Sequence, residues 1–168
     1  ETGLSLMVNT DKTTTTSPSL AEALLCKHSD CPKLLGSYVG RKWEDECEHV
    51  KQLADDHGLL FQRLPLLPVE VALKLLLICG TAKWTYTVRT HEPNATKEAS
   101  DMFTEMAVRC YCDIFGIDYD TLSQEDFARI TLPRSKGGVG VTDFTPVRDV
   151  AYAASVQGKW IKGLGLSL

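Results

Sequence analysis

The stretch PNATKEASDMFTEMAVRCYCDIFG (residues 93–116) decides the fold class that the sequence predicts. Its apolar residues recur at helical spacing, which indicates a long helix with one face toward a core. Pro93 restarts the pattern after a break, and Gly116 is a natural end for the helix because glycine tolerates the left-handed conformation. The apolar stripe consists of Ala99, Met102, Phe103, Met106, Ala107, Cys110 and Ile114.

Two segments before this stretch repeat the pattern. Residues 42–64 carry apolar positions near helical spacing after an acidic start, which the positive end of the helix dipole favours. Gly58 is expected to end or bend that helix. Pro68 suits a first helical turn, so residues 69–79 are predicted to form a second helix, which resumes beyond Gly80 toward Thr90.

Side-chain caps predict three shorter helices. Ser19, with Glu22 three residues on, forms a capping box. Ser123 and Thr145 cap the other two helices. Residues 33–40 are short, apolar and bounded by glycine, as in a strand or half a hairpin. The predicted fold class is therefore mainly α, a helical bundle of about five helices with one or two short N-terminal β-strands.

The charge of the chain is unevenly distributed. The 168 residues, about one domain in length, carry a net charge of −4, which counts against a free-standing nucleic-acid binder. From Arg129 to the end there are six basic and two acidic residues, a net charge of +4, so the remainder carries −8. The basic part is either a local basic surface or an ordinary solvated face.

The cysteines and histidines form no familiar metal-binding pattern. Cys26, Cys31 and residues 47–49 offer sulfur and nitrogen ligands for zinc, but their spacing matches no common finger, so free thiols are favoured. Cys79 is interpreted as a small core residue because it lies in an apolar run. The four histidines stand among polar neighbours and are interpreted as surface residues: His28, His49, His57 and His91.

No apolar run is long enough to span a membrane. The longest candidate, residues 69–79, is interrupted by Glu70 and Lys74 and fits a core helix better. The start of the chain shows no basic-then-apolar leader. We therefore expect an intracellular protein, nuclear or cytoplasmic, without a membrane partner.

The glycines at 137, 138 and 140 invite comparison with phosphate-binding loops. They satisfy neither the GxGxxG nor the Walker pattern, and no strong strand precedes them. A glycine turn between helices is therefore favoured over a phosphate cradle.

Four blocks of the sequence, in order, resemble the end of the reverse transcriptase domain of non-LTR retrotransposons and the segment after it. Residues 3–13 resemble the block "GLxLNxxKT", and residues 34–40 resemble the turn "LLGxxIG". Residues 66–90 look like the helical thumb segment "LPxxxALxLLrxC…YxxRT". Residues 132–155 resemble "LPxxxGGLGLxxxxxxxxxAYxAS". The resemblance covers nearly the whole chain.

This resemblance implies roles for particular residues. Residues 1–40 would be the palm-end and primer-grip segment, and residues 41–168 the helical thumb-like domain. Lys12 matches a family lysine near the leaving pyrophosphate, where it would act as an acid or stabilise charge, although an exposed strand-end lysine is the alternative. Gly36 and Tyr38 would lie beside the primer, and simple packing is the alternative for the tyrosine. Contacts to the template–primer backbone are implied for Arg89, Arg134, Lys136 and Arg148.

The catalytic aspartates of such polymerases, in the motif "YxDD" and an earlier block, do not occur in this sequence. Mg²⁺ would be held by those aspartates, so no cofactor and no metal site are expected in this chain. The resemblance thus implies part of an RNA-directed DNA polymerase that holds the RNA/DNA template–primer within the full enzyme and is inactive alone. The alternative is a non-catalytic helical module, derived from such an element, that binds a protein partner.

Overall fold

The computed structural model divides the chain into two compact units, Glu1–Glu46 and Cys47–Leu168. The boundary that the resemblance implies falls after residue 40. Side chains are described for residues 18–23 and 43–157. The structure describes the backbone of Thr14–Thr15, Pro18–Leu24, Lys27–His28, Lys33–Leu34, Ser37–Tyr38 and Trp43–Gly163.

The first unit contains one short helix and two-residue strands. Helix α1 (Pro18–Leu24) begins at its proline, so Ser19 lies inside the first turn and not before it, because the fixed φ of proline suits the first helical position. β1 pairs in parallel with β2, and β3 pairs antiparallel with β4. The strands are β1 (Thr14–Thr15), β2 (Lys27–His28), β3 (Lys33–Leu34) and β4 (Ser37–Tyr38).

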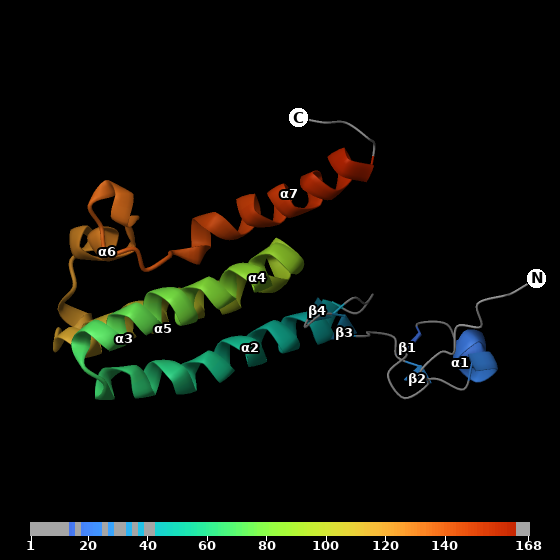
Figure 1. The fold of residues 1–168 in the computed structure, drawn as a ribbon, viewed down its shortest axis with the longest axis horizontal. Coiled ribbons are helices and arrows are strands. Elements are labelled where there is room, and N and C mark those ends of the chain that lie inside the picture. The colour runs from blue at the N-terminus through green and yellow to red at the C-terminus, as the bar shows by residue number, and fades with distance from the viewer. Residues whose placement is uncertain are drawn as a thin grey trace, which may run out of the picture. The chain divides into compact units, whose positions relative to one another are not determined.

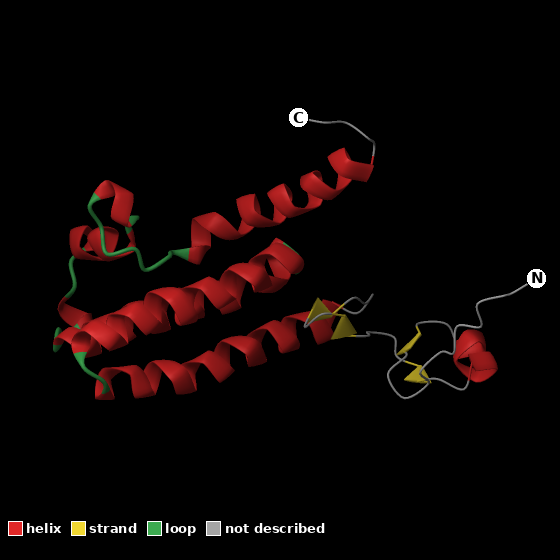
Figure 2. Cartoon of the chain, viewed as in Figure 1, coloured by secondary structure: helices red, strands yellow, loops and turns green. Residues whose placement is uncertain are grey.

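The second unit is helical, and the predicted mainly α bundle is confirmed (Figure 2). Short turns join the helices, among them the 3₁₀ turns Leu64–Leu66, Tyr119–Thr121 and Arg134–Lys136. The helices are α2 (Trp43–Arg63), which begins in the first unit, α3 (Val69–Leu75), α4 (Ala82–Thr90), α5 (Pro93–Phe115), α6 (Gln124–Thr131) and α7 (Phe144–Gly163).

Helix α5 is the centre of this bundle. Helix α7 packs against both α4 and α5, and side chains of α2 contact α4 and α5. Figure 1 shows α4 and α5 between α2 and α7. The predicted stripe of α5 faces the core, where Phe103 and Ala107 are fully buried.

Aromatic side chains fill the middle of the core around Phe103. Its ring stacks on Trp84 of α4 with centroids 4.6 Å apart and an angle of 13° between the planes. The edges of three further rings approach it, with centroids 5.3 Å away for His57, 5.4 Å for Phe61 and 5.6 Å for Phe144. Offset and edge-to-face pairs of this kind add to the free energy gained by burial. One residue of α5 thus joins α2, α4 and α7.

The helical stretch Val69–Thr90 is continuous, so the predicted interruption at Gly80 is wrong. Its middle, Leu76–Thr81, is a π-helical segment between α3 and α4. Gly80 is needed there because a Cβ atom would lie 2.8 Å from Cε1 of Phe61. Cys79 in the same segment is exposed and not a core residue.

Helix α2 also continues through its glycine, which the sequence had marked as an end or a bend. A Cβ atom on Gly58 would meet Sδ of Met106 at 3.7 Å, an ordinary contact. The glycine is tolerated because packing against α5 outweighs its weak helix preference.

Among the described residues, the stretch Val69–Thr90 is the helix long and apolar enough to cross a membrane by length and composition alone. Its most apolar window has a mean hydropathy of 1.2, and 39% of that window is buried in the bundle. Core helices of globular proteins have the same properties, and here Leu76 and Trp84 are fully buried.

Caps begin and end the helices largely as the sequence predicts. Gly116 ends α5 with a φ of 65°, and Ser123 and Asp126 form a reciprocal capping box at α6. The hydrogen bonds from Ser123 hold the pKa of the Asp126 carboxyl below its ordinary value. Helix α7 differs, because Oδ1 of Asp143 accepts a hydrogen bond from the Thr145 N–H at 3.0 Å. Asp143, and not Thr145, is therefore the cap.

Two of the histidines predicted at the surface are buried. His91 is 1% exposed and His57 is 6% exposed, because His57 continues the buried face of α2 formed by Val50, Ala54 and Phe61. Its Nδ1 lies 2.6 Å from the Leu53 carbonyl oxygen, and its Nε2 has no hydrogen-bond partner in the described part of the chain. Burial, the largest cause, lowers the pKa of His57 from its ordinary value of 6.5.

This lowered pKa predicts that acid destabilises the fold. The unfolded chain binds the His57 proton more tightly than the folded chain, so the free energy of unfolding should fall as the pH drops below about 6.5. The fall due to this residue should stop below its folded pKa, and its slope cannot exceed about 1.4 kcal/mol per pH unit. Urea denaturation followed by circular dichroism between about pH 8 and about pH 5 measures the effect.

The control variant is His57→Phe, which cannot titrate. A change in core packing shifts the stability of the variant equally at every pH. The pH dependence of the difference in free energy of unfolding between the two proteins therefore reports the protonation of His57 alone. If this difference stays constant below about pH 6.5, the imidazole is not the titrating group.

Candidate functional site

The predicted site residues of the first unit are placed only in part. Lys12 and Gly36 lie outside the described residues. Tyr38 lies in β4, where it pairs with Lys33, and only its backbone is described. Their roles at a primer end therefore stay predictions.

The four predicted basic residues of the second unit lie on two helices and one turn. Arg89 is exposed in the last turn of α4. Arg134 and Lys136 are both exposed in the 3₁₀ turn Arg134–Lys136, so the structure brings these two together. Within the described part of the chain, no carboxylate pairs with any of the three.

Arg148 has a different environment. Its side chain is 12% exposed, and Nη1 lies 3.4 Å from Oδ1 of Asp101 in α5. Its Nε lies 3.3 Å from Oδ1 of Asp149. Thr145 donates a hydrogen bond to the same Asp101 oxygen at 2.8 Å. Arg148 therefore fastens α7 to α5, and a phosphate would have to displace these carboxylates.

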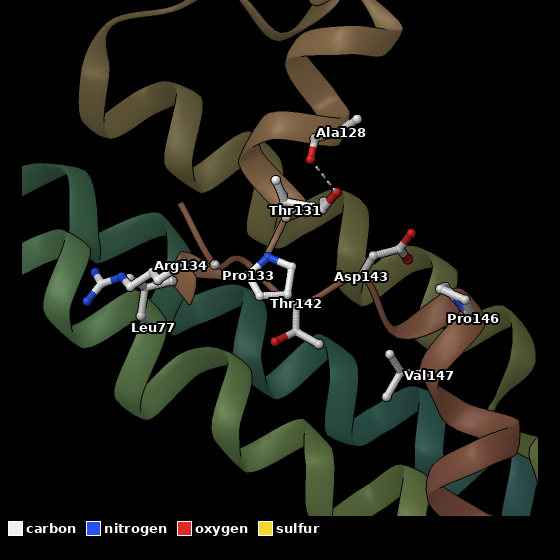
Figure 3. A pocket seen from close by; sticks show the side chains of 11 residues that line it. Leu77, Ala128, Thr131, Pro133, Arg134, Thr142, Asp143, Pro146 and Val147 are labelled. Carbon is white, nitrogen blue, oxygen red and sulfur yellow. Dashed lines mark hydrogen bonds between the residues drawn. The ribbon is translucent and has the colours of Figure 1, made fainter. Parts of the chain in front are cut away.

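A groove lies between the end of α6, the loop after it and the start of α7, and we call it the α6–α7 groove (Figure 3). Its volume is about 650 Å³. Leu77, in the π-helical segment, contributes to it from outside this part of the sequence. The groove is lined by Leu77, Ala128, Thr131, Leu132, Pro133, Arg134, Gly140, Thr142, Asp143, Pro146 and Val147.

The glycine-containing loop beside the groove hydrogen-bonds to itself. The backbone N–H groups of residues 137, 138, 139 and 141 donate to the carbonyl oxygens of residues 134, 133, 129 and 130, respectively, at 3.0 to 3.2 Å. Those donors are already occupied, so they cannot cradle a phosphate as the loops of nucleotide-binding proteins do. The predicted glycine turn describes the loop correctly.

Each glycine of this loop occupies a position where any other residue would be strained or would clash. Gly137 and Gly140 have φ angles of 84° and 91°, in the left-handed region that favours glycine. Gly138 has no room for a side chain, because a Cβ atom there would overlap the carbonyl group of Leu132. The loop therefore turns back tightly on the end of α6.

Arg134 is held in position at one side of the groove. Its Nε donates a hydrogen bond to the Val139 carbonyl oxygen at 3.2 Å. Its stem lies against Gly140, where a Cβ atom would be only 3.2 Å from Cγ. The terminal nitrogens of the guanidinium have no partner among the described residues. The loop thus presents a fixed cation beside apolar side chains.

Two polar side chains that line the groove are engaged in local hydrogen bonds. The Thr131 hydroxyl donates within its own helix, to Phe127 at 3.0 Å, and the Asp143 carboxylate caps α7. No nucleophile with an adjacent base lines the groove. Across the part of the chain that the structure describes, no three histidine, cysteine or acidic side chains gather to hold a metal.

The free-thiol interpretation concerns six cysteines, and the structure describes four of them. Cys110 is buried, and its thiol donates to the Phe61 carbonyl oxygen at 3.4 Å. Burial raises the pKa of this thiol to about 12, so it is unreactive at neutral pH. Cys47, Cys79, Cys110 and Cys112 form no disulfide with one another.

Comparison of the chain with models of protein families, with curated proteins and with solved structures returned no match. Sequence reasoning found Arg134 but missed Leu77, Pro146 and Val147, because the groove forms only when segments far apart in sequence pack together.

The steric requirement at Gly138 predicts the effect of two matched substitutions. Gly138→Ala should lower the free energy of unfolding by about 2 kcal/mol or more, because the new methyl group overlaps a backbone carbonyl. Gly58→Ala, in a helix with room for the methyl group, should raise it by about 0.5–1 kcal/mol. Urea denaturation of both variants measures the difference, and an equal effect at the two positions would contradict the loop geometry.

Proposed function

We propose that the chain is a positioning segment of a retroelement RNA-directed DNA polymerase, which holds the RNA/DNA template–primer and does not catalyse. The four blocks that resemble the end of such a polymerase support this proposal. In such an enzyme Mg²⁺ and the catalytic aspartates would stand outside these blocks, and Lys12, Gly36 and Tyr38 would lie near the primer end. The expected location is intracellular.

The observation that carries the proposal is the separation of charge between the helices. Helix α2 has six acidic and two basic residues, and α5 has four acidic and two basic. The stretch Val69–Thr90 has three basic residues and one acidic residue. Residues 129–168 have six basic and two acidic residues. Helix α7 packs on α4 as well as on the acidic α5, so the two basic elements are neighbours. Phosphate affinity depends on such local concentrations of Lys and Arg.

The exposed basic residues suit positioning better than sequence reading. Arg89, Arg134 and Lys136 are exposed and unpaired within the described residues, so they are free to meet phosphates. Contacts of this kind fix the register of a protein on a duplex and carry no base information. Arg148 would add a fourth contact only after release from Asp101.

This proposal predicts salt-dependent binding to a short RNA–DNA hybrid, measured by fluorescence anisotropy with the full chain. The triple variant Arg89→Gln, Arg134→Gln, Lys136→Gln should bind more weakly. Its plot of log affinity against log salt should be shallower by about 2 to 3, because each lost phosphate contact removes nearly one released counterion.

The matched control is Lys51→Gln, Arg63→Gln, Lys97→Gln. It removes the same charge from exposed positions of α2 and α5 and should keep the wild-type slope. A chain that does not bind the hybrid at micromolar concentration and low salt would refute the proposal. Incorporation of nucleotides on a primed template would instead refute the claim that the chain is not catalytic.

The α6–α7 groove favours a second function, the binding of a protein partner. Its floor is apolar and open to solvent, which suits a protein surface better than a phosphate backbone. This agrees with the alternative of a helical protein-interaction module, and it does not depend on nucleic-acid binding.

A further inference from the structure

The floor of the α6–α7 groove is apolar and accessible. Leu132 and Val147 remain 37% and 39% exposed, and Leu77, Pro133 and Pro146 lie beside them. A volume of about 650 Å³ is in the range of sites that hold ligands or a few side chains. Two prolines hold this part of the backbone stiff, so the groove is formed before a partner arrives.

The apolar surface extends beyond the groove. Ile78, which follows Leu77, is 68% exposed, and Val150, one turn after Val147 in α7, is 69% exposed. A small molecule inside the groove would leave these side chains in water. An extended or helical protein segment would cover them together with the floor.

The positive charge of Arg134 at the groove favours a partner that carries a carboxylate. Asp143 is used as the cap of α7, where the positive end of the helix dipole balances it. This leaves Arg134 as the cation that lines the groove, with terminal nitrogens that have no partner among the described residues. Lys136 follows two residues further on. A guanidinium held by its Nε presents two terminal nitrogens as a fork that matches a carboxylate.

We propose that the α6–α7 groove binds a segment of a partner protein that presents an apolar side chain with an Asp or Glu beside it. The apolar side chain enters between Leu77, Leu132 and Val147, and the carboxylate meets the Arg134 guanidinium. The proposal rests on the protein-partner function proposed above and does not rest on template–primer binding.

A nucleic-acid backbone fits the same groove less well. Its phosphates would face Leu77 and the two prolines, and the backbone N–H groups of residues 137, 138, 139 and 141 are already occupied. The apolar floor would gain nothing from a phosphate. Nucleic acid is therefore the competing outcome of the test.

The experiment is selection of random peptides displayed on phage against the full folded chain. The selected peptides are expected to share an apolar residue next to Asp or Glu. Their affinities are then measured by fluorescence anisotropy for the unsubstituted chain and for three variants: Val147→Glu, Arg134→Lys and the control Val71→Glu. Circular dichroism checks that each variant is folded.

Val147→Glu should weaken the binding of the selected peptides about tenfold or more, because it places a charge on the apolar floor. Arg134→Lys should also weaken them, since lysine lacks the planar fork although it keeps the charge. Val71→Glu makes the same substitution at a helix position that is 46% exposed and lies outside the groove. It should have little effect on the binding of the peptides.

Other results would overturn the proposal. They are the absence of enriched peptides, enrichment of basic peptides, or equal binding by the Val147→Glu and Val71→Glu variants. If Val147→Glu instead weakens binding of the RNA–DNA hybrid more than Val71→Glu does, the groove belongs to the nucleic-acid surface. Failure of the hybrid to bind at all would refute template–primer binding and leave this proposal standing.

Discussion

The stacking of Phe103 on Trp84 is the interaction on which the rest of the bundle depends, because the other aromatic contacts converge on the same ring. His57 and Phe61 approach from α2, and Phe144 approaches from the start of α7. Each aromatic pair of this geometry adds about 0.5–1.5 kcal/mol beyond the burial of its area. Because α5 supplies the shared ring, the three neighbouring helices are positioned relative to it and, through it, to one another.

This constraint also positions the α6–α7 groove. Phe144 packs on Phe103, and its backbone N–H donates to the Thr104 hydroxyl at 3.1 Å, so α7 begins at a fixed point on α5. The ion pair between Arg148 and Asp101 holds the next turn. Pro146 and Val147 lie between these attachments and therefore stand opposite Leu77 as one wall of the groove. Arg148, which was expected to contact phosphate, thus holds α7 in place beside the groove.

The periodic apolar stripe of residues 93–116 was enough to predict the fold class and the central helix, because helical spacing is a local property of the sequence. The misjudged residues depend on distant partners. Gly80 was taken as a break, but the glycine makes room for Phe61 across the helix pair. His57 stands beside two exposed aspartates and was taken as a surface residue, yet its helical position turns it into the aromatic cluster. The groove was invisible for the same reason, since Leu77 meets residues 128–147 only in the folded chain.

Arg134 is the residue at which the two proposed functions meet. A guanidinium binds phosphate and carboxylate with the same fork, so its chemistry alone does not choose between them. Its surroundings do: the apolar side chains of the groove favour a carboxylate that arrives beside an apolar residue, whereas Arg89 has no such floor. A peptide seated in the groove would take Arg134 away from the basic surface and leave Lys136 and Arg89 to the nucleic acid. Because binding free energies are linked, each ligand would then weaken the other by the same factor. If both proposals hold, a partner protein in the groove would weaken the binding of a template–primer without contacting the remaining cations.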